Sequence, residues 1–474
     1  DDGFDKELFG RAAEAIISAM RALPNDVPLH TEACAALRDI VENDLTAELV
    51  AARGGLEALL ESIRLHADSH EVQHSTLGAI RSLCRRRENA ASLVASGGLE
   101  SVLQSMSGHA PVQVVHEEGC GLFQALVAHG DFEEALHGAG TVPSLLESMR
   151  NHPTSDSMQR DACHVLGRLS EKTEGASLVA KGGGVELLTA ALRSQAGHAD
   201  SMRHDITALR NVMAADPENG PKSLRQAGGV EAILAAMSAH ADVPHVQASA
   251  VSALRGLTQD AECVAHAEGA GAVEAVARAL RKHPTEATVQ RDACGSLCNL
   301  ASTDTGKAKA LAAGAPDLVV AAMRQHASDG GVQEAACSAL RQVTTGSKEA
   351  MAIAAAAGGI EAAVAAMQAH AGNAVVQLGA CGALRNVAVG GPHEARLTAA
   401  GGVAAVVAAM VADPHCLDLQ NCSCTILRRL TSRAEHVAEV STVGGVEALV
   451  AAMKNHPLDA GVQQDGCAAV RNLT

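Results

Sequence analysis

The chain lacks aromatic bulk. Its 474 residues include no Trp, no Tyr and only four Phe, although 47% of them are hydrophobic. A compact globular domain of this length would normally use aromatic side chains to fill its core. Small aliphatic side chains must therefore do the packing, which suits short helices that cross closely. Single compact cores also stop growing at about 250 to 300 residues, a limit that stacked repeats do not share.

Positive charge and long hydrophobic runs are also scarce. The net charge of −17 has the wrong sign for neutralising phosphates, so we expect no nucleic-acid partner. The longest apolar stretches, such as Gly401 to Ala412, are shorter than the roughly 18 to 20 residues that cross a bilayer. We therefore expect no transmembrane segment. The first residues, Asp1 to Asp5, do not resemble a signal peptide, which we expect to be absent or already removed.

A small-residue turn before an apolar run recurs along the whole chain at intervals of 43 to 45 residues. Such a period is typical of stacked repeats. We therefore predict a single domain over residues 1–474, built of about eleven repeats, the first of which is divergent. The repeats are marked by Gly10, Gly54, Gly97, Gly140, Gly183, Gly228, Gly271, Gly314, Gly358, Gly401 and Gly444.

Each repeat is predicted to hold three helices. After the pair Gly444-Gly445, an Ala- and Leu-rich run with helical spacing continues to Met453. Pro457 cannot continue a helix, so the chain turns there before a longer helix that ends near Leu473. A brief helical segment precedes each glycine turn. We call these elements the short helix, the second helix and the long helix, in chain order.

Three sequence features resemble the armadillo-repeat family. They are the glycine pair followed by Val-Glu-Ala-Leu, the Val-Gln before the long helix, and endings such as Ala383 to Val387. The resemblance implies an all-α fold, a right-handed α-α superhelix of about eleven three-helix repeats, and binding of protein partners. HEAT repeats are the nearest rival, but they lack the short helix that ends at Gly-Gly.

The long helix presents one buried and one exposed face. With Asn386 as position zero, Cys381, Leu384 and Val387 cluster within about 120° and predict the buried face. In the family that the chain resembles, Asn at position zero and Trp at position −4 line a concave peptide-binding surface. Here position zero is Asn in four of eleven repeats and position −4 is never Trp. We therefore expect no peptide grip of the nuclear-import-receptor type.

Position −1 is more regular, because Arg occupies it in eight repeats. We call these residues the arginine row: Arg38, Arg81, Arg210, Arg255, Arg341, Arg385, Arg428 and Arg471. A row of guanidinium groups suits an acidic or extended partner segment. Alternatively, each Arg pairs with an acid of a neighbouring repeat, such as Asp292 or Asp465. Our candidate partner-binding residues are Arg210, Asn211, Arg255, Asn299, Arg341, Arg385, Asn386, Arg428, Arg429, Arg471 and Asn472.

Cysteine and histidine follow the repeat, which indicates packing more than chemistry. Eight Cys share position −5, where we expect buried, reduced thiols and hence an intracellular reducing compartment. Cys416, Cys422 and Cys424 with His415 match no standard zinc spacing, so we predict no metal site. Eight His end a second helix, where a capping role is the expectation and a pH sensor the alternative. We predict no catalytic residue and no cofactor.

The two ends of the chain differ. Phe4 and Phe9 are expected to plug the open end of the core, whereas the buried-face pattern continues through Cys467, Val470 and Leu473. This suggests a fragment of a longer protein, or a neighbouring subunit that covers the C-terminal end. The leading functional prediction is a protein-binding scaffold. The alternatives are a structural subunit or spacer of a large assembly, such as a cytoskeletal or ciliary complex, and a targeting arm of a longer multidomain protein.

Overall fold

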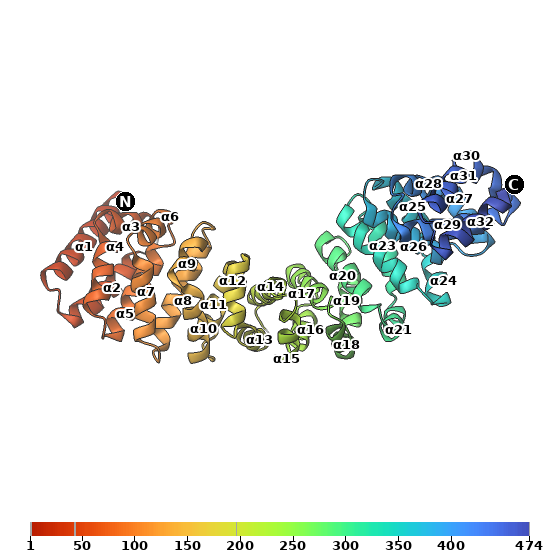
Figure 1. Ribbon diagram of the computed structural model, residues 1–474. Coiled ribbons are helices and arrows are strands. Elements are labelled where there is room, and N and C mark those ends of the chain that lie inside the picture. Colours follow the sequence, from red (N-terminus) through yellow and green to blue (C-terminus); the bar gives the residue numbers. More distant parts are fainter. Residues whose placement is uncertain (1, 42–43, 196, 474) are drawn as a thin grey trace. The chain divides into compact units, whose positions relative to one another are not determined.

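The computed structural model describes residues 2–41, 44–195 and 197–473, and every regular element in these ranges is an α-helix. The chain divides into two compact units, Asp1–Ala232 and Ile233–Thr474, which we describe separately. The all-α prediction is confirmed, while the number of repeats and the single domain stay predictions. Figure 1 colours the chain from red at the N-terminus to blue at the C-terminus.

In the N-terminal unit the long helices α2, α5, α8, α11 and α14 contact one another in chain order. Each second helix from α4 onward packs against the long helix that follows it. From α3 onward, a short helix connects each long helix to the next second helix (Figure 1). The helices of this unit are α1 (Asp2–Ala22), α2 (Val27–Ile40), α3 (Asp44–Ala52), α4 (Gly55–Leu65), α5 (His70–Leu83), α6 (Arg87–Ala95), α7 (Gly98–Gly108), α8 (Gln113–Val127), α9 (Glu133–Ala139), α10 (Thr141–Asn151), α11 (Asp156–Leu169), α12 (Thr173–Lys181), α13 (Gly184–Ser194), α14 (Ala199–Ala215) and α15 (Gly220–Gln226).

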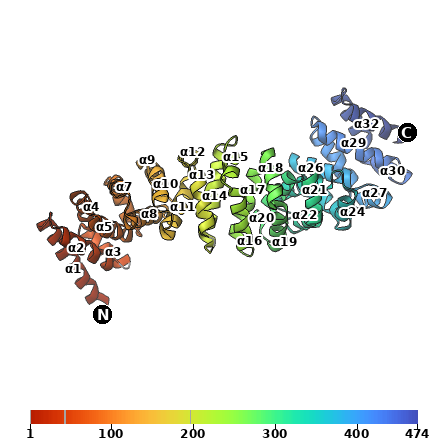
Figure 2. The ribbon, with the colours of Figure 1, turned by 90° about the horizontal axis from the view of Figure 1, so that it is seen from below.

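The C-terminal unit has the same order of elements, and its long helices α17, α20, α23, α26, α29 and α32 contact in sequence (Figure 2). The division between the units falls within α16 (Gly229–Ala239). The helices that follow are α17 (Pro244–Leu257), α18 (Ala261–Ala270), α19 (Ala272–Lys282), α20 (Ala287–Leu300), α21 (Asp304–Ala312), α22 (Ala315–Gln325), α23 (Gly330–Thr344), α24 (Lys348–Ala356), α25 (Gly359–Ala369), α26 (Ala374–Val387), α27 (Gly391–Ala399), α28 (Gly402–Ala412), α29 (Leu417–Thr431), α30 (Ala434–Thr442), α31 (Gly445–Asn455) and α32 (Ala460–Leu473).

Glycine turns separate each short helix from the second helix, as the sequence predicts. From Gly54 to Gly444, all ten of the predicted turn glycines have φ between 68° and 92°. Only glycine adopts this left-handed conformation at little cost, which explains why each turn has glycine at this position. Gly10 differs, because α1 runs unbroken from Asp2 to Ala22. The divergent first repeat thus fuses its short and second helices.

The core follows the predicted face of the long helix. Cys381, Leu384 and Val387 are all at most 2% exposed. One end prediction is wrong, and the expected burial of the eight Cys fails at one of them. Cys467 is exposed, because no described helix packs on that side of α32. Phe9 is 42% exposed and plugs nothing, while the side chain of Phe4 lies outside the described part of the structure.

Among the described residues, no single helix is long and apolar enough to cross a membrane. Two strongly bent pairs, α24 with α25 and α27 with α28, reach the required length and composition only when they are taken together.

Candidate protein-binding surface on the long helices

A buried glutamine fixes the start of most long helices, and its role was missed in the sequence. Gln333 Nε2 donates to the Met323 carbonyl at 2.8 Å and to the His326 carbonyl at 2.9 Å. These carbonyls end the second helix, where no intrahelical donor remains for them. The Val-Gln pair was noted only as a mark of the family. Its spacing of seven residues after a helix-ending His is the signal that could have revealed the role.

The position-zero asparagines bond within the protein. Asn386 Nδ2 donates to the Arg341 carbonyl and to Thr344 Oγ1, both at 3.1 Å. Asn299 makes the same pair of contacts, with the Arg255 carbonyl at 3.3 Å and Thr258 Oγ1 at 3.1 Å. These bonds close the end of the preceding long helix.

The other position-zero residues named as candidates act similarly. Asn211 donates to Ser170 Oγ at 3.2 Å and Asn472 to Thr431 Oγ1 at 3.4 Å, while an Arg429 N–H donates to the Arg385 carbonyl. Burial, with Arg428 and Arg385 nearby, lowers the pKa of Arg429. Position zero therefore joins adjoining repeats in both units.

The arginine row lies over position −4 of the following long helix. A β-carbon at Gly295 would come within 2.7 Å of Arg255 Nε, and one at Gly78 within 3.1 Å of Arg38 Cδ. The aliphatic stem of Arg341 likewise occupies the space that a β-carbon at Gly382 would take. The missing Trp at position −4 and the presence of Arg at position −1 are thus one feature, since both side chains would occupy the same space.

Part of the arginine row is paired with carboxylates of the next repeat, as the alternative interpretation stated. Arg255 Nη1 lies 2.9 Å from Asp292 Oδ1, and Arg428 Nε lies 2.7 Å from Asp465 Oδ1. Burial opposes ionisation of Asp292, but Arg291 and Arg255 hold its pKa below the ordinary value. In the N-terminal unit, Arg81 Nη1 lies 3.4 Å from Glu118 Oε2. The guanidinium groups of Arg81, Arg255 and Arg428 are therefore neutralised by carboxylates of the next repeat.

Arg341 and Arg385 differ from these, because among the described residues no carboxylate lies within ion-pair distance of either guanidinium. The next long helices carry Gly379 and Cys422 where Asp292 and Asp465 stand elsewhere. Both side chains are half-buried. Burial raises the pKa of Cys422, and the charges of Arg385 and Arg341 both oppose that shift. The remaining members diverge, since Arg210 donates to Asn211 Oδ1 at 3.0 Å and Arg471 is exposed.

Histidine and cysteine mostly take the predicted structural places. His283 ends α19 and its Nε2 lies 2.8 Å from the Ala241 carbonyl of the preceding repeat. His370 makes the equivalent contact with Ala327 at 2.9 Å. Burial raises the pKa of the Cys294 thiol to about 12, so it stays protonated and unreactive at neutral pH. Within the described ranges no group of three or more His, Cys, Asp or Glu is arranged to hold a metal ion.

Comparisons with known proteins identify a family and similar folds for this chain. A family model described as LRRK2 ARM repeat matches residues 11–396. An engineered protein, structural genomics target OR497, aligns over 97% of this chain and 98% of its own, with 23% identity and a TM-score of 0.62. A chain from work on a phosphorylation switch in the interaction between cadherin and beta-catenin aligns over the same shares, with 15% identity and a TM-score of 0.71. Both show likeness of fold alone. No curated protein sequence matches significantly.

Proposed function

Because the chain belongs to the LRRK2 ARM repeat family, we propose that it is a non-catalytic scaffold that binds an acidic, extended segment of a partner protein. The proposed surface is the long-helix face of the C-terminal unit, centred on Arg341 and Arg385. The armadillo-repeat fold is typical of protein-interaction scaffolds, which supports the general function. The proposal that the partner segment is acidic rests on the charges of this chain's own residues.

The observation that carries the proposal is the contrast within the arginine row. Arg255 and Arg428 flank the surface and have carboxylate partners, whereas Arg341 and Arg385 between them have none among the described residues. Half-burial of a cation costs solvation, and a carboxylate with hydrogen-bond geometry would offset that cost. The aliphatic stem of Arg341 is held against Gly382, so its guanidinium is positioned before any partner arrives. Such preorganisation lowers the entropy lost on binding.

The proposal is tested with the full chain and two labelled, end-blocked peptides, one rich in Glu and one with Gln at the same places. We expect the Glu peptide to bind more tightly. The double variant Arg341→Glu and Arg385→Glu should weaken that binding by about tenfold or more, because two cations become anions. Fluorescence anisotropy at several salt concentrations measures the affinities, and the salt dependence should fall in the variant.

A matched control reverses two charges elsewhere on the same unit. Arg278→Glu with Lys454→Glu changes the net charge equally, but these residues lie exposed on second helices. We expect this control to bind the Glu peptide nearly as wild type does. Equal weakening in both double variants, with intact circular dichroism, would show that only net charge matters and would overturn the proposed surface. Equal affinity for the Glu and Gln peptides would contradict the proposal that the partner segment is acidic.

A further inference from the structure

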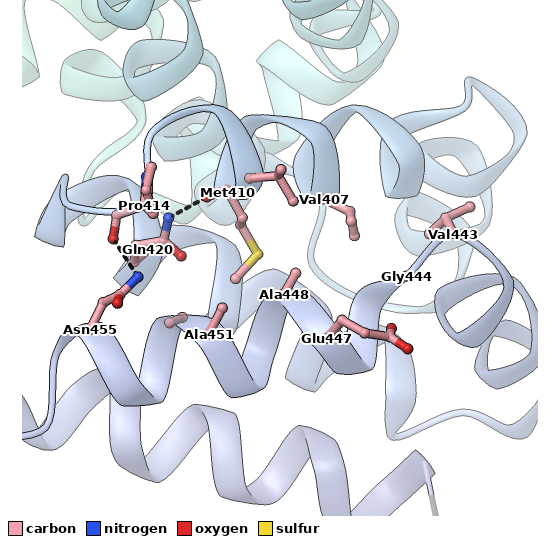
Figure 3. Close-up of a pocket in the computed structure, with 12 residues that line it drawn as sticks. Val407, Met410, Pro414, Gln420, Val443, Gly444, Glu447, Ala448, Ala451 and Asn455 are labelled. Carbon is pink, nitrogen blue, oxygen red and sulfur yellow. Dashed lines mark hydrogen bonds between the residues drawn. The ribbon is translucent and has the colours of Figure 1, made fainter.

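A second surface lies on the other side of the C-terminal unit, between two consecutive second helices. A pocket of about 400 Å³ opens between α28 and α31 (Figure 3). Val407 and Met410 of α28 line one wall, and Ala448 and Ala451 of α31 line the other. Val411 of α28 is also among the lining residues. The volume lies within the usual range for ligand pockets, and most of the lining is apolar.

At four other places in the array, a polar side chain bridges the corresponding gap, whereas Ser107 and Ser238 stand at that position in two further repeats. Arg193, in the last turn of α13, donates to the Ala227 carbonyl at 3.2 Å and to the Gly228 carbonyl at 2.8 Å. Arg281 of α19 donates to the Ala313 carbonyl at 3.1 Å. Gln368 of α25 reaches the Ala400 carbonyl at 3.4 Å, and Arg150 of α10 reaches that of Gly182. Each bridge joins the end of one second helix to the glycine turn that precedes the next.

The bridge is missing at the pocket because Val411 stands ten residues after Gly401, where Arg281 and Gln368 follow their own turn glycines. Val411 is 68% exposed. No side chain among the described residues donates to the carbonyls of Val443 and Gly444, which are the acceptors that the pattern specifies. The early Glu that most other second helices carry is also replaced in α28, by Ala404.

The polar groups at the pocket select for a cation. Glu447 is exposed at one end of the pocket, close to Gly444 (Figure 3). It provides a carboxylate beside the carbonyls of Val443 and Gly444. The whole chain has a net charge of −17, so its field also attracts cations. An incoming guanidinium would form the bonds that Arg193 and Arg281 form with the glycine turns of the repeats that follow them.

We propose that this pocket binds a segment of a partner protein that presents an Arg beside an apolar side chain. The apolar side chain enters between Met410, Val411 and Ala451. The guanidinium donates to the Val443 and Gly444 carbonyls and lies near Glu447. This site is independent of the proposed long-helix surface, because it lies on the second helices and selects the opposite charge.

The test uses the full chain and a library of short, end-blocked peptides, each with a fixed Arg next to a fixed Leu and neutral residues elsewhere. A second library has Glu in place of the Arg. We expect binding to be enriched in the Arg library and centred on the pocket in protection mapping. Val411→Arg should restore the internal bridge and fill the pocket, which would weaken binding by about tenfold or more. Ala451→Phe fills the same volume without adding charge and should weaken binding as well.

Ser238→Arg is the matched control, because Ser238 occupies the same place in α16 and its substitution adds the same charge. We expect it to bind the Arg library as wild type does. Glu447→Gln should weaken the Arg peptides several-fold while leaving a neutral Leu peptide unaffected. No preference for the Arg library would overturn the proposal. Equal weakening by Val411→Arg and Ser238→Arg would do the same, because the effect would then be charge alone.

Discussion

The two compact units use different buried side chains to hold the same helix pair together. In the C-terminal unit every long helix places Gln at position −9, and each donates to two carbonyls that end the second helix: Gln247, Gln290, Gln333, Gln377, Gln420 and Gln463. In the N-terminal unit only Gln73 and Gln159 do so. His30, His116 and Met202 take that position in the other repeats.

The replacement by histidine adds a contact with the following repeat. His30 Nδ1 lies 2.9 Å from Ser62 Oγ, and His116 Nδ1 lies 2.7 Å from Ser148 Oγ, each in the following repeat. The equivalent residue in the C-terminal unit is always Ala. Serine therefore accompanies the histidine as a partner. The comparison shows that one backbone accepts either a neutral amide contact within a repeat or a titratable contact between repeats.

Titratable groups are accordingly concentrated in the core of the N-terminal unit. Among the described residues, three histidine pairs lie in this unit and none in the other. Ring centroids are 4.4 Å apart for His30 and His66, 4.8 Å for His116 and His152, and 4.0 Å for His164 and His204. We therefore expect acid to affect the two units differently.

The largest expected effect comes from removing one glutamine of the C-terminal unit. Gln333→Leu should lower the free energy of unfolding by about 2 kcal/mol, because the Met323 carbonyl loses its side-chain donor and the His326 carbonyl keeps only the Asp329 N–H. Urea unfolding of the full chain measures the change, and hydrogen exchange locates it at α22 and α23. A loss below about 0.5 kcal/mol would show that the amide is not required.

Gln333→His sharpens this comparison by imitating the N-terminal unit. The imidazole should not rescue stability alone, because the following repeat has Ala366 where Ser148 accepts from His116. Adding Ala366→Ser should recover about 1 kcal/mol, the usual net value of one buried hydrogen bond. Ala366→Ser in the wild-type background is the control, and it should be neutral or destabilising.

Acid should loosen the N-terminal unit before the C-terminal unit. Burial, with His152 and His109 nearby, lowers the pKa of His116 to about 4, and burial beside His164 and Arg203 lowers the pKa of His204 to about 3. The ordinary value is about 6.5. Below that pH the unfolded chain binds protons that the folded chain excludes, so stability falls from about pH 6.5 toward pH 4. The loss between pH 7 and pH 5 should reach about 2 kcal/mol.

Hydrogen exchange at pH 7 and pH 5, corrected for intrinsic rates, measures this difference helix by helix. Protection should fall in α8 and α11, fall less in α14, where the titration of Asp205 opposes that of His204, and persist in α20, α23 and α26. His116→Gln with Ser148→Ala converts one repeat to the form used in the C-terminal unit and should flatten the response at α8. Uniform loss of protection in both units would contradict the role of the histidine pairs.

The buried carboxyl of Asp205 has the opposite pH dependence. Asp205 is fully buried in α14, and burial raises its pKa to about 7, although a hydrogen bond with the Cys163 thiol opposes that shift. The unfolded carboxyl ionises near pH 3.9, so this group costs stability as pH rises from about 4 to 7. Asp205→Asn should therefore stabilise the protein by about 1 to 2 kcal/mol at pH 7.

The stabilisation should shrink as pH falls toward 4 and vanish below about pH 3, where wild-type Asp205 is protonated in both states. The variant should also show a steeper loss in acid, because the opposing titration is gone. Thermal unfolding at pH 7.5, 6 and 4 checks both points. A gain that is independent of pH would mean that packing, and not ionisation, limits this site.

The sequence was sufficient to predict features that depend on one repeat alone. The turn glycines and the buried face of Cys381, Leu384 and Val387 follow from local periodicity, and both are confirmed. Contacts between repeats were harder to predict, because they join residues about forty positions apart. Asp292 and Asp465 were identified as acids of the neighbouring repeat, but the roles of Gln333 and Ser148 were not.

The expected burial of Cys467 failed for a related reason. Cys467 has the pattern of a buried residue, but burial also needs a neighbouring helix, and sequence periodicity does not supply one. The bridge that is missing at Val411 was overlooked in the same way, since Val is an ordinary helix residue until its neighbour's carbonyls are considered. Sequence periodicity therefore predicts the repeat well and its exceptions poorly, whereas the candidate binding surfaces consist of exceptions.

The smallest expected effect compares paired and unpaired members of the arginine row. Arg255→Ala should cost about 1 kcal/mol, because Asp292 is only 7% exposed and loses one of its cations while Arg291 remains. Arg385→Ala should cost less than about 0.5 kcal/mol, since no carboxylate among the described residues depends on it. Urea unfolding of both variants gives the difference. If Arg385→Ala proved the more costly, Arg385 would have a structural role, and its availability to an acidic partner would be in question.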